Sequence, residues 1–200
     1  EGDWVTLVGH VTDPNLGDSL TVEVDWADGT PRTPVFASGR QFVAQHVYRD
    51  EGGNGLSVGQ YDVRLYVRDQ WNYETVTPQG RFTQQVANRT PSQLDLPLTN
   101  FTFTEGQTVE LPVSFFDPGT LDSHAVAIDW GDQSPPTILN LPPDTMSGGW
   151  RSLFGASAPQ HVYWNKADST TSYTIRVSVA DDDEPNSKAT AVTTIQVAPT

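Results

Sequence analysis

The chain has 200 residues and a formal net charge of −14, and 36% of its residues are hydrophobic. This apolar fraction suffices for one or two folded domains with cores of their own. The negative charge opposes binding to phosphate backbones, which argues against a nucleic-acid partner. The absence of cysteine excludes disulfides and thiolate metal sites. No apolar run is long enough to span a bilayer, so we expect no membrane insertion.

The first part of the chain recurs in the second. Residues 1–31 align with residues 105–135 without a gap, and thirteen of the paired residues are identical. The sequence QHVY also recurs, at residues 45–48 and 160–163. A repeat of this kind indicates a duplicated structural module. We therefore predict one domain over residues 1–89 and a second over residues 90–200, the second carrying a long inserted loop at residues 141–159.

The predicted elements are short strands, because apolar side chains recur at every second position. In copy one this pattern covers residues 22–26 and 61–67, and in copy two it covers residues 126–130 and 173–179. The expected inward residues are Val22, Val24, Trp26, Tyr61, Val63, Leu65 and Val67, with Val126, Ile128, Trp130, Tyr173, Ile175, Val177 and Val179 as counterparts. About seven such strands per copy and no helical pattern predict an all-β protein of two tandem immunoglobulin-like antiparallel β-sandwiches.

The two copies differ at their beginnings. Residues 96–104 of copy two read as a strand ahead of Glu105, whereas copy one starts at Glu1 with nothing ahead of it. We expect the first strand of copy one to be missing. Such a domain should be less stable than its partner, or should recruit an edge strand from a neighbour.

The turns VDWADGT and IDWGDQS are each followed by HVY and then by YxVxLxVxD or YxIxVxVxD. In this order the motifs resemble the PKD domain, named after the polycystic kidney disease protein repeats, and the resemblance covers nearly the whole chain. Two departures are Ala27 and Gln133, which stand where the family's turn usually has glycine. The variant with EG at a strand start looks like modules repeated in large bacterial surface proteins.

This resemblance implies a non-catalytic extracellular or cell-surface module that acts as a spacer or adhesion repeat of a larger protein. Its expected partners are the neighbouring domains of the same chain and a protein or polysaccharide at the cell surface. The alternative is a carbohydrate-binding accessory module of a secreted hydrolase.

Candidate catalytic residues have structural explanations. Asp28 and Asp132 lie in turns, where an aspartate side chain accepts backbone N–H bonds. His46 and His161 recur with the following tyrosines, and we expect both to be hydrogen-bonded struts. Because no nucleophile, base or phosphate-binding motif occurs, the chain is not expected to be an enzyme.

Acidic residues gather where predicted strands end, and loops at one end of a sandwich lie close together. Calcium takes six to eight oxygen ligands from such side chains. Some PKD modules bind calcium through a turn aspartate and the aspartate after the YxVxLxVxD strand, positions that Asp13 and Asp69, or Asp117 and Asp181, match. The alternative is a solvated acidic surface. The candidate ligands are Asp13, Asp18 and Asp69 in copy one, and Asp117, Asp122, Asp181, Asp182 and Asp183 in copy two, with Glu184 next to them.

The inserted loop carries Trp150 and Phe154. Apolar side chains in a loop need burial or a partner, so two interpretations compete. We expect both rings to fold back and be largely buried against copy two. The alternative is an aromatic contact for carbohydrate or protein, since tryptophan often anchors such interfaces.

Overall fold

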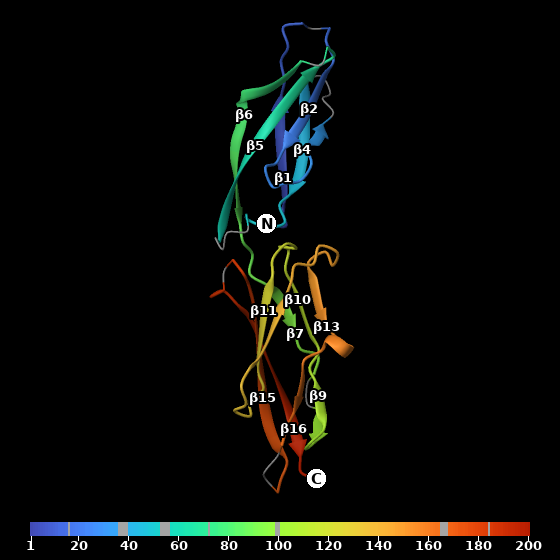
Figure 1. Ribbon diagram of the computed structural model, residues 1–200, viewed down its shortest axis with the longest axis vertical. Coiled ribbons are helices and arrows are strands. Elements are labelled where there is room, and N and C mark those ends of the chain that lie inside the picture. Colours follow the sequence, from blue (N-terminus) through green and yellow to red (C-terminus); the bar gives the residue numbers. More distant parts are fainter. Residues whose placement is uncertain are drawn as a thin grey trace. The chain divides into compact units, whose positions relative to one another are not determined.

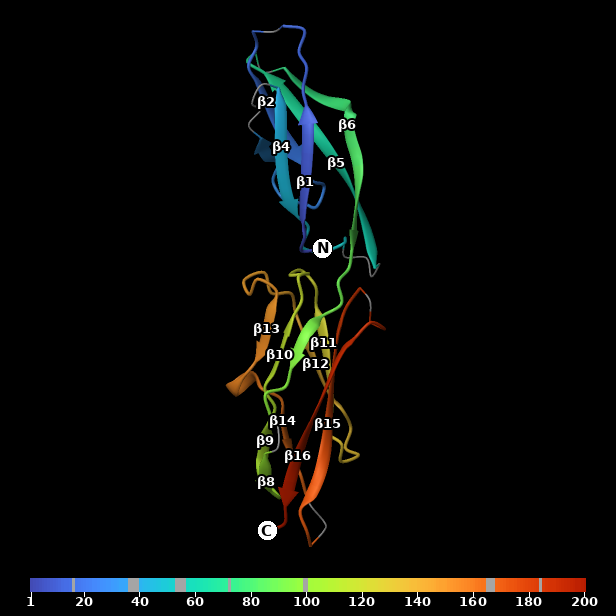
Figure 2. The ribbon, with the colours of Figure 1, turned by 180° about the vertical axis from the view of Figure 1, so that it is seen from behind.

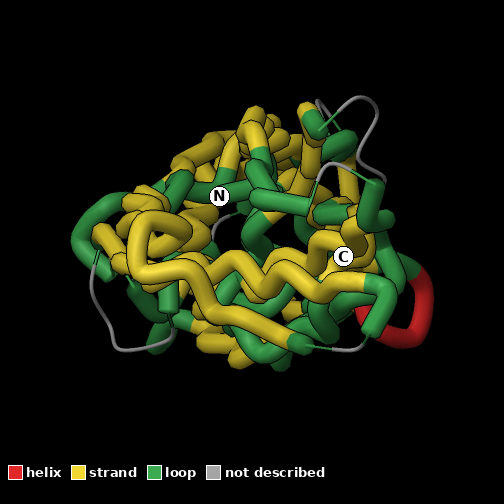
Figure 3. Tube along the Cα trace, turned by 90° about the horizontal axis from the view of Figure 1, so that it is seen from above, coloured by secondary structure: helices red, strands yellow, loops and turns green. Residues whose placement is uncertain are grey.

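The computed structural model describes residues 1–15, 17–35, 40–52, 57–71, 73–98, 101–164, 168–183 and 185–200, without the side chains of residues 76–81. It divides into two compact units, Glu1–Asn88 and Arg89–Thr200. The division falls one residue before the boundary expected from the sequence. Strands and loops make up the described chain, apart from one short 3₁₀ helix, drawn red in Figure 3. None of the described helices is long and apolar enough to cross a membrane.

Unit 1 is a two-layer sandwich (Figure 1). One layer pairs β1 (Trp4–His10) with β4 (Gln41–Val47) over seven residue pairs. The other has the strand order β3-β2-β5-β6, built from β3 (Thr33–Val35), β2 (Leu20–Asp25), β5 (Val58–Asp69) and β6 (Glu74–Ala87). All pairs are antiparallel.

Unit 2 has the same layers with more strands, several of which are seen from behind in Figure 2. One layer contains the orders β13-β10-β7 and β14-β9, and the other the order β12-β11-β15-β16-β8. The expected antiparallel pairing holds except between β8 and β16, which run parallel. The bounds are β7 Ser92–Asp95, β8 Thr102–Thr104, β9 Thr108–Glu110, β10 Val113–Phe116, β11 His124–Asp129, β12 Thr137–Leu141, β13 Trp150–Leu153, β14 Gln160–Val162, β15 Thr171–Asp181 and β16 Ala189–Ala198.

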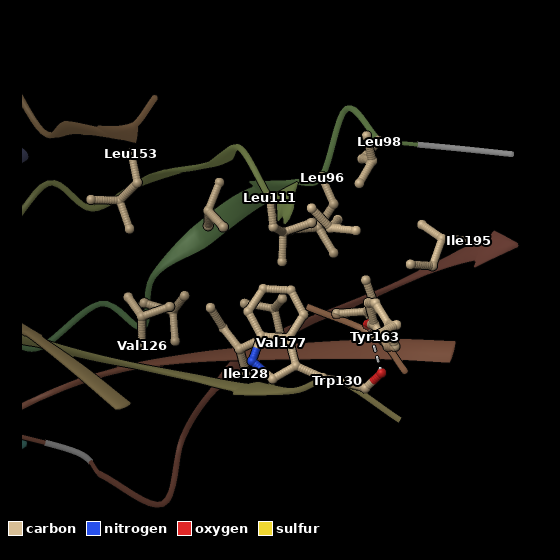
Figure 4. Close-up of a cluster of buried hydrophobic side chains, with 14 of the residues drawn as sticks. Leu96, Leu98, Leu111, Val126, Ile128, Trp130, Leu153, Tyr163, Val177 and Ile195 are labelled. Atoms are coloured by element: carbon tan, nitrogen blue, oxygen red, sulfur yellow. Dashed lines mark hydrogen bonds between the residues drawn. The ribbon is translucent and has the colours of Figure 1, made fainter. Parts of the chain in front are cut away.

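The predicted alternation places the expected side chains in the two cores. Trp26 and Trp130 are completely buried, each in the core of its own unit, and Figure 4 shows Trp130 among the aliphatic side chains of unit 2. Most of the other residues expected to point inward are buried as well; the partly buried exceptions, each packed against its core, are Leu65, Val67 and Tyr173.

The stretch over residues 141–159 is not one long loop, so that prediction is wrong. It contains β13 and the 3₁₀ helix Gly155–Ser157. In unit 1 the single strand β4 pairs along the whole of β1, whereas in unit 2 β13 and β14 pair separately with β10 and β9. Pro112 lies between β9 and β10 and has no backbone N–H, so it interrupts the ladder there.

Candidate functional site

In unit 1 a tryptophan and an aspartate that follow β2 form a cluster with a histidine of β4. His46 stacks flat on Trp26, with ring centroids 4.8 Å apart and an interplanar angle of 10°. His46 Nε2 lies 2.6 Å from Asp28 Oδ2. Because a carboxylate only accepts, this ring nitrogen carries the proton. The other oxygen, Asp28 Oδ1, accepts from the backbone N–H of Thr30 at 3.1 Å and from its hydroxyl at 2.5 Å.

Unit 2 repeats this cluster. His161 stacks on Trp130 at 4.8 Å and 11°, and its Nε2 lies 2.7 Å from Asp132 Oδ2. Asp132 Oδ1 accepts from the Ser134 N–H at 3.0 Å and from the Ser134 hydroxyl at 2.5 Å. The histidines thus hold the turns to the cores in both units, which is the strut role expected for them.

Each cluster is tied to a buried tyrosine. The Tyr163 hydroxyl donates to the carbonyl of Trp130 at 2.9 Å, the dashed line in Figure 4, and Tyr48 donates to Trp26 O at 3.0 Å. Burial raises the pKa of both tyrosines, so neither ionises near neutral pH. The indole N–H groups are satisfied too, by Thr33 in unit 1 and by Thr137 in unit 2.

This arrangement does not build a nucleophile. In a serine hydrolase the histidine accepts the hydroxyl proton and the aspartate stands behind the histidine. Here Asp132 stands between His161 and Ser134, and the hydroxyl donates to the carboxylate. The sequence reasoning missed Thr30 and Ser134, although the gapless alignment of the two copies pairs them.

The two turn aspartates have a depressed pKa. Burial acts to raise the pKa of Asp28, but hydrogen bonds from Thr30 and His46 outweigh it and lower the pKa below its usual value. In Asp132 the same balance, with Ser134 and His161 as donors, lowers the pKa. A depressed folded-state pKa stabilises the fold above the ordinary aspartate pKa of about 3.9, and this stabilisation is lost as the pH falls through the folded-state value.

We therefore expect the variant carrying Asp28→Asn and Asp132→Asn to have a lower free energy of unfolding than the wild type at pH 7. When the pH falls from about 5 to about 2.5, the free energy of unfolding should decrease less in this variant than in the wild type. Urea unfolding at several pH values measures this. Asp62→Asn, at an exposed position, is the matched control. Parallel stability curves for the wild type and the double variant would contradict the assignment.

In unit 2 the predicted metal ligands form two close pairs, and Asp122 belongs to both. A carboxylate oxygen of Asp122 lies within 4.8 Å of one from Asp117, and another such pair joins Asp122 to Asp183. All three side chains are buried, as is Asp181 at the end of β15. Asp117 Oδ1 accepts the Gly119 N–H at 2.9 Å, which sets the turn. Asp182 is exposed and accepts the Ser123 N–H at 2.9 Å, and Glu184 lies outside the described residues.

His124 belongs to this group and was missed from the sequence. Its Nε2 lies 3.0 Å from Asp117 Oδ2, and it stands directly across the β11–β15 ladder from Asp181. Its Nδ1 is buried and has no hydrogen-bond partner among the described residues. The sequence did contain a signal for it, because His124, Val126 and Ile128 occupy alternate positions and therefore point to the same, inward side of the strand.

The three metal ligands predicted in unit 1 make separate contacts. Asp13 accepts the Asn15 N–H at 2.7 Å, and Asp18 accepts from the Gln70 side chain at 2.9 Å. Asp69 accepts the N–H groups of Trp71 and Tyr73, at 2.9 and 3.0 Å. Among the described residues, some acidic side chains form groups of three or more whose oxygens are close enough to hold one ion. Asp13, Asp18 and Asp69 belong to none of these groups.

The expectation that Trp150 and Phe154 are largely buried is wrong, because they are 47% and 49% exposed. Trp150 begins β13, where alternate side chains face opposite ways, and it is Leu153 that points into the core. Trp150 contacts Phe116 across the ladder, with ring centroids 5.3 Å apart. Phe154 lies between β13 and the 3₁₀ helix, so neither ring caps the sandwich.

We expect Trp150→Ala to lower the free energy of unfolding by about 1 kcal/mol, which is the contribution of one aromatic contact. Leu153→Ala, on the same strand, should cost about 3 kcal/mol because it empties a core position. Chemical denaturation of the two variants gives the comparison. A larger loss for Trp150→Ala than for Leu153→Ala would reinstate the capping interpretation.

No protein-family model matches the chain, and no curated protein matches it, so the PKD resemblance stays a prediction. Among solved structures, the chain is similar to fibronectin(III)-like modules of Clostridium thermocellum CbhA, with 13% identity, a TM-score of 0.33, and coverage of 99% of this chain and 87% of that one. It is also similar to the teleost fish polymeric Ig receptor ectodomain, with 10% identity, a TM-score of 0.30, and coverage of 100% and 94%. At these scores the likeness carries no inference about function.

Proposed function

We propose that this chain is a non-catalytic structural and interaction module, a spacer or adhesion repeat of a larger extracellular or cell-surface protein. One observation carries the proposal. The clusters around His46 and His161, which combine a histidine, an aspartate and a hydroxyl group, show the same closed hydrogen-bonded arrangement, in which each aspartate separates the histidine from the hydroxyl group. A set used identically in both units serves the fold they share.

The test is an assay of peptide, ester and polysaccharide hydrolysis by the full chain, with His161→Gln as the paired variant. We expect no turnover above buffer for either protein. Turnover by the wild type that His161→Gln abolishes would overturn the non-catalytic proposal.

We propose further that calcium stabilises unit 2, held by Asp117 and Asp122 with Asp181, Asp182 or Asp183. The support is the approach of carboxylate oxygens from separate turns, in a chemistry that suits a hard cation. Extracellular calcium modules have dissociation constants of roughly 10⁻⁴ to 10⁻³ M. Calcium at about ten times that constant adds about 1.4 kcal/mol, or several degrees in melting temperature.

Calorimetric unfolding in EDTA and in about 5 mM CaCl₂ tests this proposal. We expect calcium to raise the wild-type melting temperature, magnesium not to reproduce the shift, and the variant Asp117→Asn with Asp181→Asn to lack it. The matched pair Asp13→Asn with Asp69→Asn examines the equivalent positions of unit 1. Identical curves in EDTA and calcium would leave a solvated acidic surface.

A carbohydrate-binding accessory role is the second candidate, favoured by the exposure of Trp150 and Phe154. Exposed aromatic rings stack on sugars. Retention of the chain on insoluble polysaccharides, lost in Trp150→Ala with the fold intact, would support this role over the spacer role. If the wild type and Trp150→Ala were retained equally, the surface around Trp150 would be excluded as the carbohydrate-binding site.

A further inference from the structure

The outer face of the layer β13-β10-β7 in unit 2 presents three aromatic rings, and Figure 2 shows the three strands side by side. Residues directly opposite each other on antiparallel strands share a face, and Phe116 lies opposite Trp150. Phe154 follows Trp150 by four positions in extended backbone, so its ring is on the same face. This face, here called the aromatic platform, consists of Phe116, Trp150 and Phe154 with Ser92, Asp95, Ser114 and Ser152.

The backbone on both sides of β13 is fixed, which holds the rings in place. Directly before Trp150, Gly149 has a φ of +94°, and a Cβ atom there would lie 2.4 Å from Asp117 O, so only glycine fits. The Asp117 N–H donates to Gly149 O at 2.8 Å. After the strand, the Ser157 hydroxyl accepts from the Phe154 N–H at 3.1 Å and donates to Phe154 O at 2.9 Å. A fixed surface loses little conformational entropy when it binds a ligand.

The side chains of the platform are those that recognise sugars. The C–H groups on the face of a sugar ring can stack on an aromatic ring, and sugar hydroxyls can exchange hydrogen bonds with serine hydroxyls. Trp150 and Phe154 are about 13 Å apart along the strand, with the exposed Ser152 between them. A single sugar ring cannot reach both aromatic rings, so the platform requires a chain of sugars.

The charge of the molecule excludes acidic polysaccharides. Asp95 is the one charged member of the platform, and the whole chain has a net charge of −14. Arg151, which lies within β13, has the opposite parity to Trp150 and donates to Pro142 O at 2.8 Å. A polyanionic sugar chain would be repelled and would meet no cation on the platform. The matching ligand is therefore uncharged.

The angle between the rings excludes a flat ligand. The planes of Phe116 and Trp150 are tilted by 57°. The surface of a crystalline polysaccharide is planar, so rings that stack on it together must lie in one plane. Tilted rings instead match a single polysaccharide chain, whose successive sugars can turn relative to one another.

We propose that the aromatic platform of unit 2 binds single chains of an uncharged polysaccharide. Trp150 and Phe154 stack on two sugars of the chain, and Ser152 exchanges hydrogen bonds with the hydroxyl groups between them. This inference rests on the carbohydrate-binding role, the second candidate function above, and specifies its ligand. Acidic polysaccharides and crystalline surfaces are excluded from it.

Affinity electrophoresis of the full chain tests the proposal, in gels that contain soluble mixed-linkage β-glucan, xylan or galactomannan, with polygalacturonate as the charged comparison. We expect at least one neutral polymer to retard the chain and polygalacturonate to leave its migration unchanged. The hexasaccharide of the retarding polymer should bind at least about tenfold more tightly than its disaccharide, which is too short to reach both rings. Isothermal titration calorimetry measures the two affinities.

Variants of the chain locate the site. Trp150→Ala and Phe154→Ala should each weaken hexasaccharide binding about fivefold, the effect of one aromatic contact. Trp164→Ala removes an exposed tryptophan of unit 2 that lies outside the platform, and it should leave binding unchanged. Circular dichroism checks that each variant is folded. Equal affinities of the wild type, Trp150→Ala and Phe154→Ala would overturn the proposal.

The remaining outcomes separate this inference from the function on which it rests. Retardation by polygalacturonate, or equal affinities for the hexasaccharide and the disaccharide, would overturn the inference. Retention on crystalline cellulose without retardation by any soluble neutral polymer would also overturn it, but would leave the carbohydrate-binding role standing. If neither soluble nor insoluble polysaccharides bound the chain, the inference and the carbohydrate-binding role would both fall, and the spacer role would remain.

Discussion

Trp130→Ala is expected to lower the free energy of unfolding of unit 2 by about 4 kcal/mol, the loss typical of large aromatic residues removed from cores. Trp130 is completely buried, and the substitution removes three interactions of its side chain. Its ring stacks on His161, its indole N–H donates to Thr137, and it is part of the hydrophobic core of unit 2.

The loss should be confined to one unit. Calorimetry of the full chain should show the unit 2 transition shifted down while the unit 1 transition is unchanged, since the two cores are separate clusters. Trp164→Ala is the matched control, because Trp164 is 71% exposed and its removal should change stability by less than about 0.5 kcal/mol. Equal losses for the two tryptophans would mean that the core does not depend on Trp130.

Alternation of side chains and internal repetition predicted most of the fold. Where apolar residues alternate and both copies agree, as around Trp26 and Trp130, the inward face follows directly from the period of a strand. The same alternation marked Leu65 and Val67 as inward. Their partial exposure could not be read from their own strand, because it depends on which side chains of other elements pack over them.

The inserted region was mispredicted for a related reason. Residues 141–159 have no counterpart of equal length in copy one, so the repeat supplied no register for Trp150 and Phe154. A strand with the pattern of β13 leaves one of two faces to solvent, and four residues are too few to show by composition which face that is. Pairing with β10 decides it, since Leu153 lies opposite Val113.

The acidic site was predicted in part. Recurrence in both copies drew attention to Asp117 and Asp122 together with Asp13 and Asp18, yet only the unit 2 pair lies among close carboxylates. The difference between the units is visible at one aligned position, where His124 of copy two replaces Leu20 of copy one. An inward histidine beside an aspartate turn is a polar group that needs a partner, and the partner is Asp117.

Asp117→Ala is therefore expected to lower the free energy of unfolding of unit 2 by about 3 kcal/mol, even without calcium. The substitution removes the acceptor of two donors in a buried setting, the Gly119 N–H at 2.9 Å and the His124 Nε2 at 3.0 Å. Each donor left unsatisfied costs about 1–3 kcal/mol. Asp13→Ala, the aligned change in unit 1, should cost about 1 kcal/mol, because Asp13 is less buried and its carboxylate accepts the Asn15 N–H of its own turn.

Asp117→Asn separates the hydrogen bonds from the charge. The amide oxygen can still accept from Gly119, and the amide N–H₂ can donate to His124 Nε2 if the ring proton moves to Nδ1. We expect this variant to recover most of the stability lost in Asp117→Ala, with the ring-proton shift visible in the ¹⁵N chemical shifts of His124. Equal destabilisation by alanine and asparagine would mean that the carboxylate charge, rather than the two hydrogen bonds, holds this end of unit 2 together.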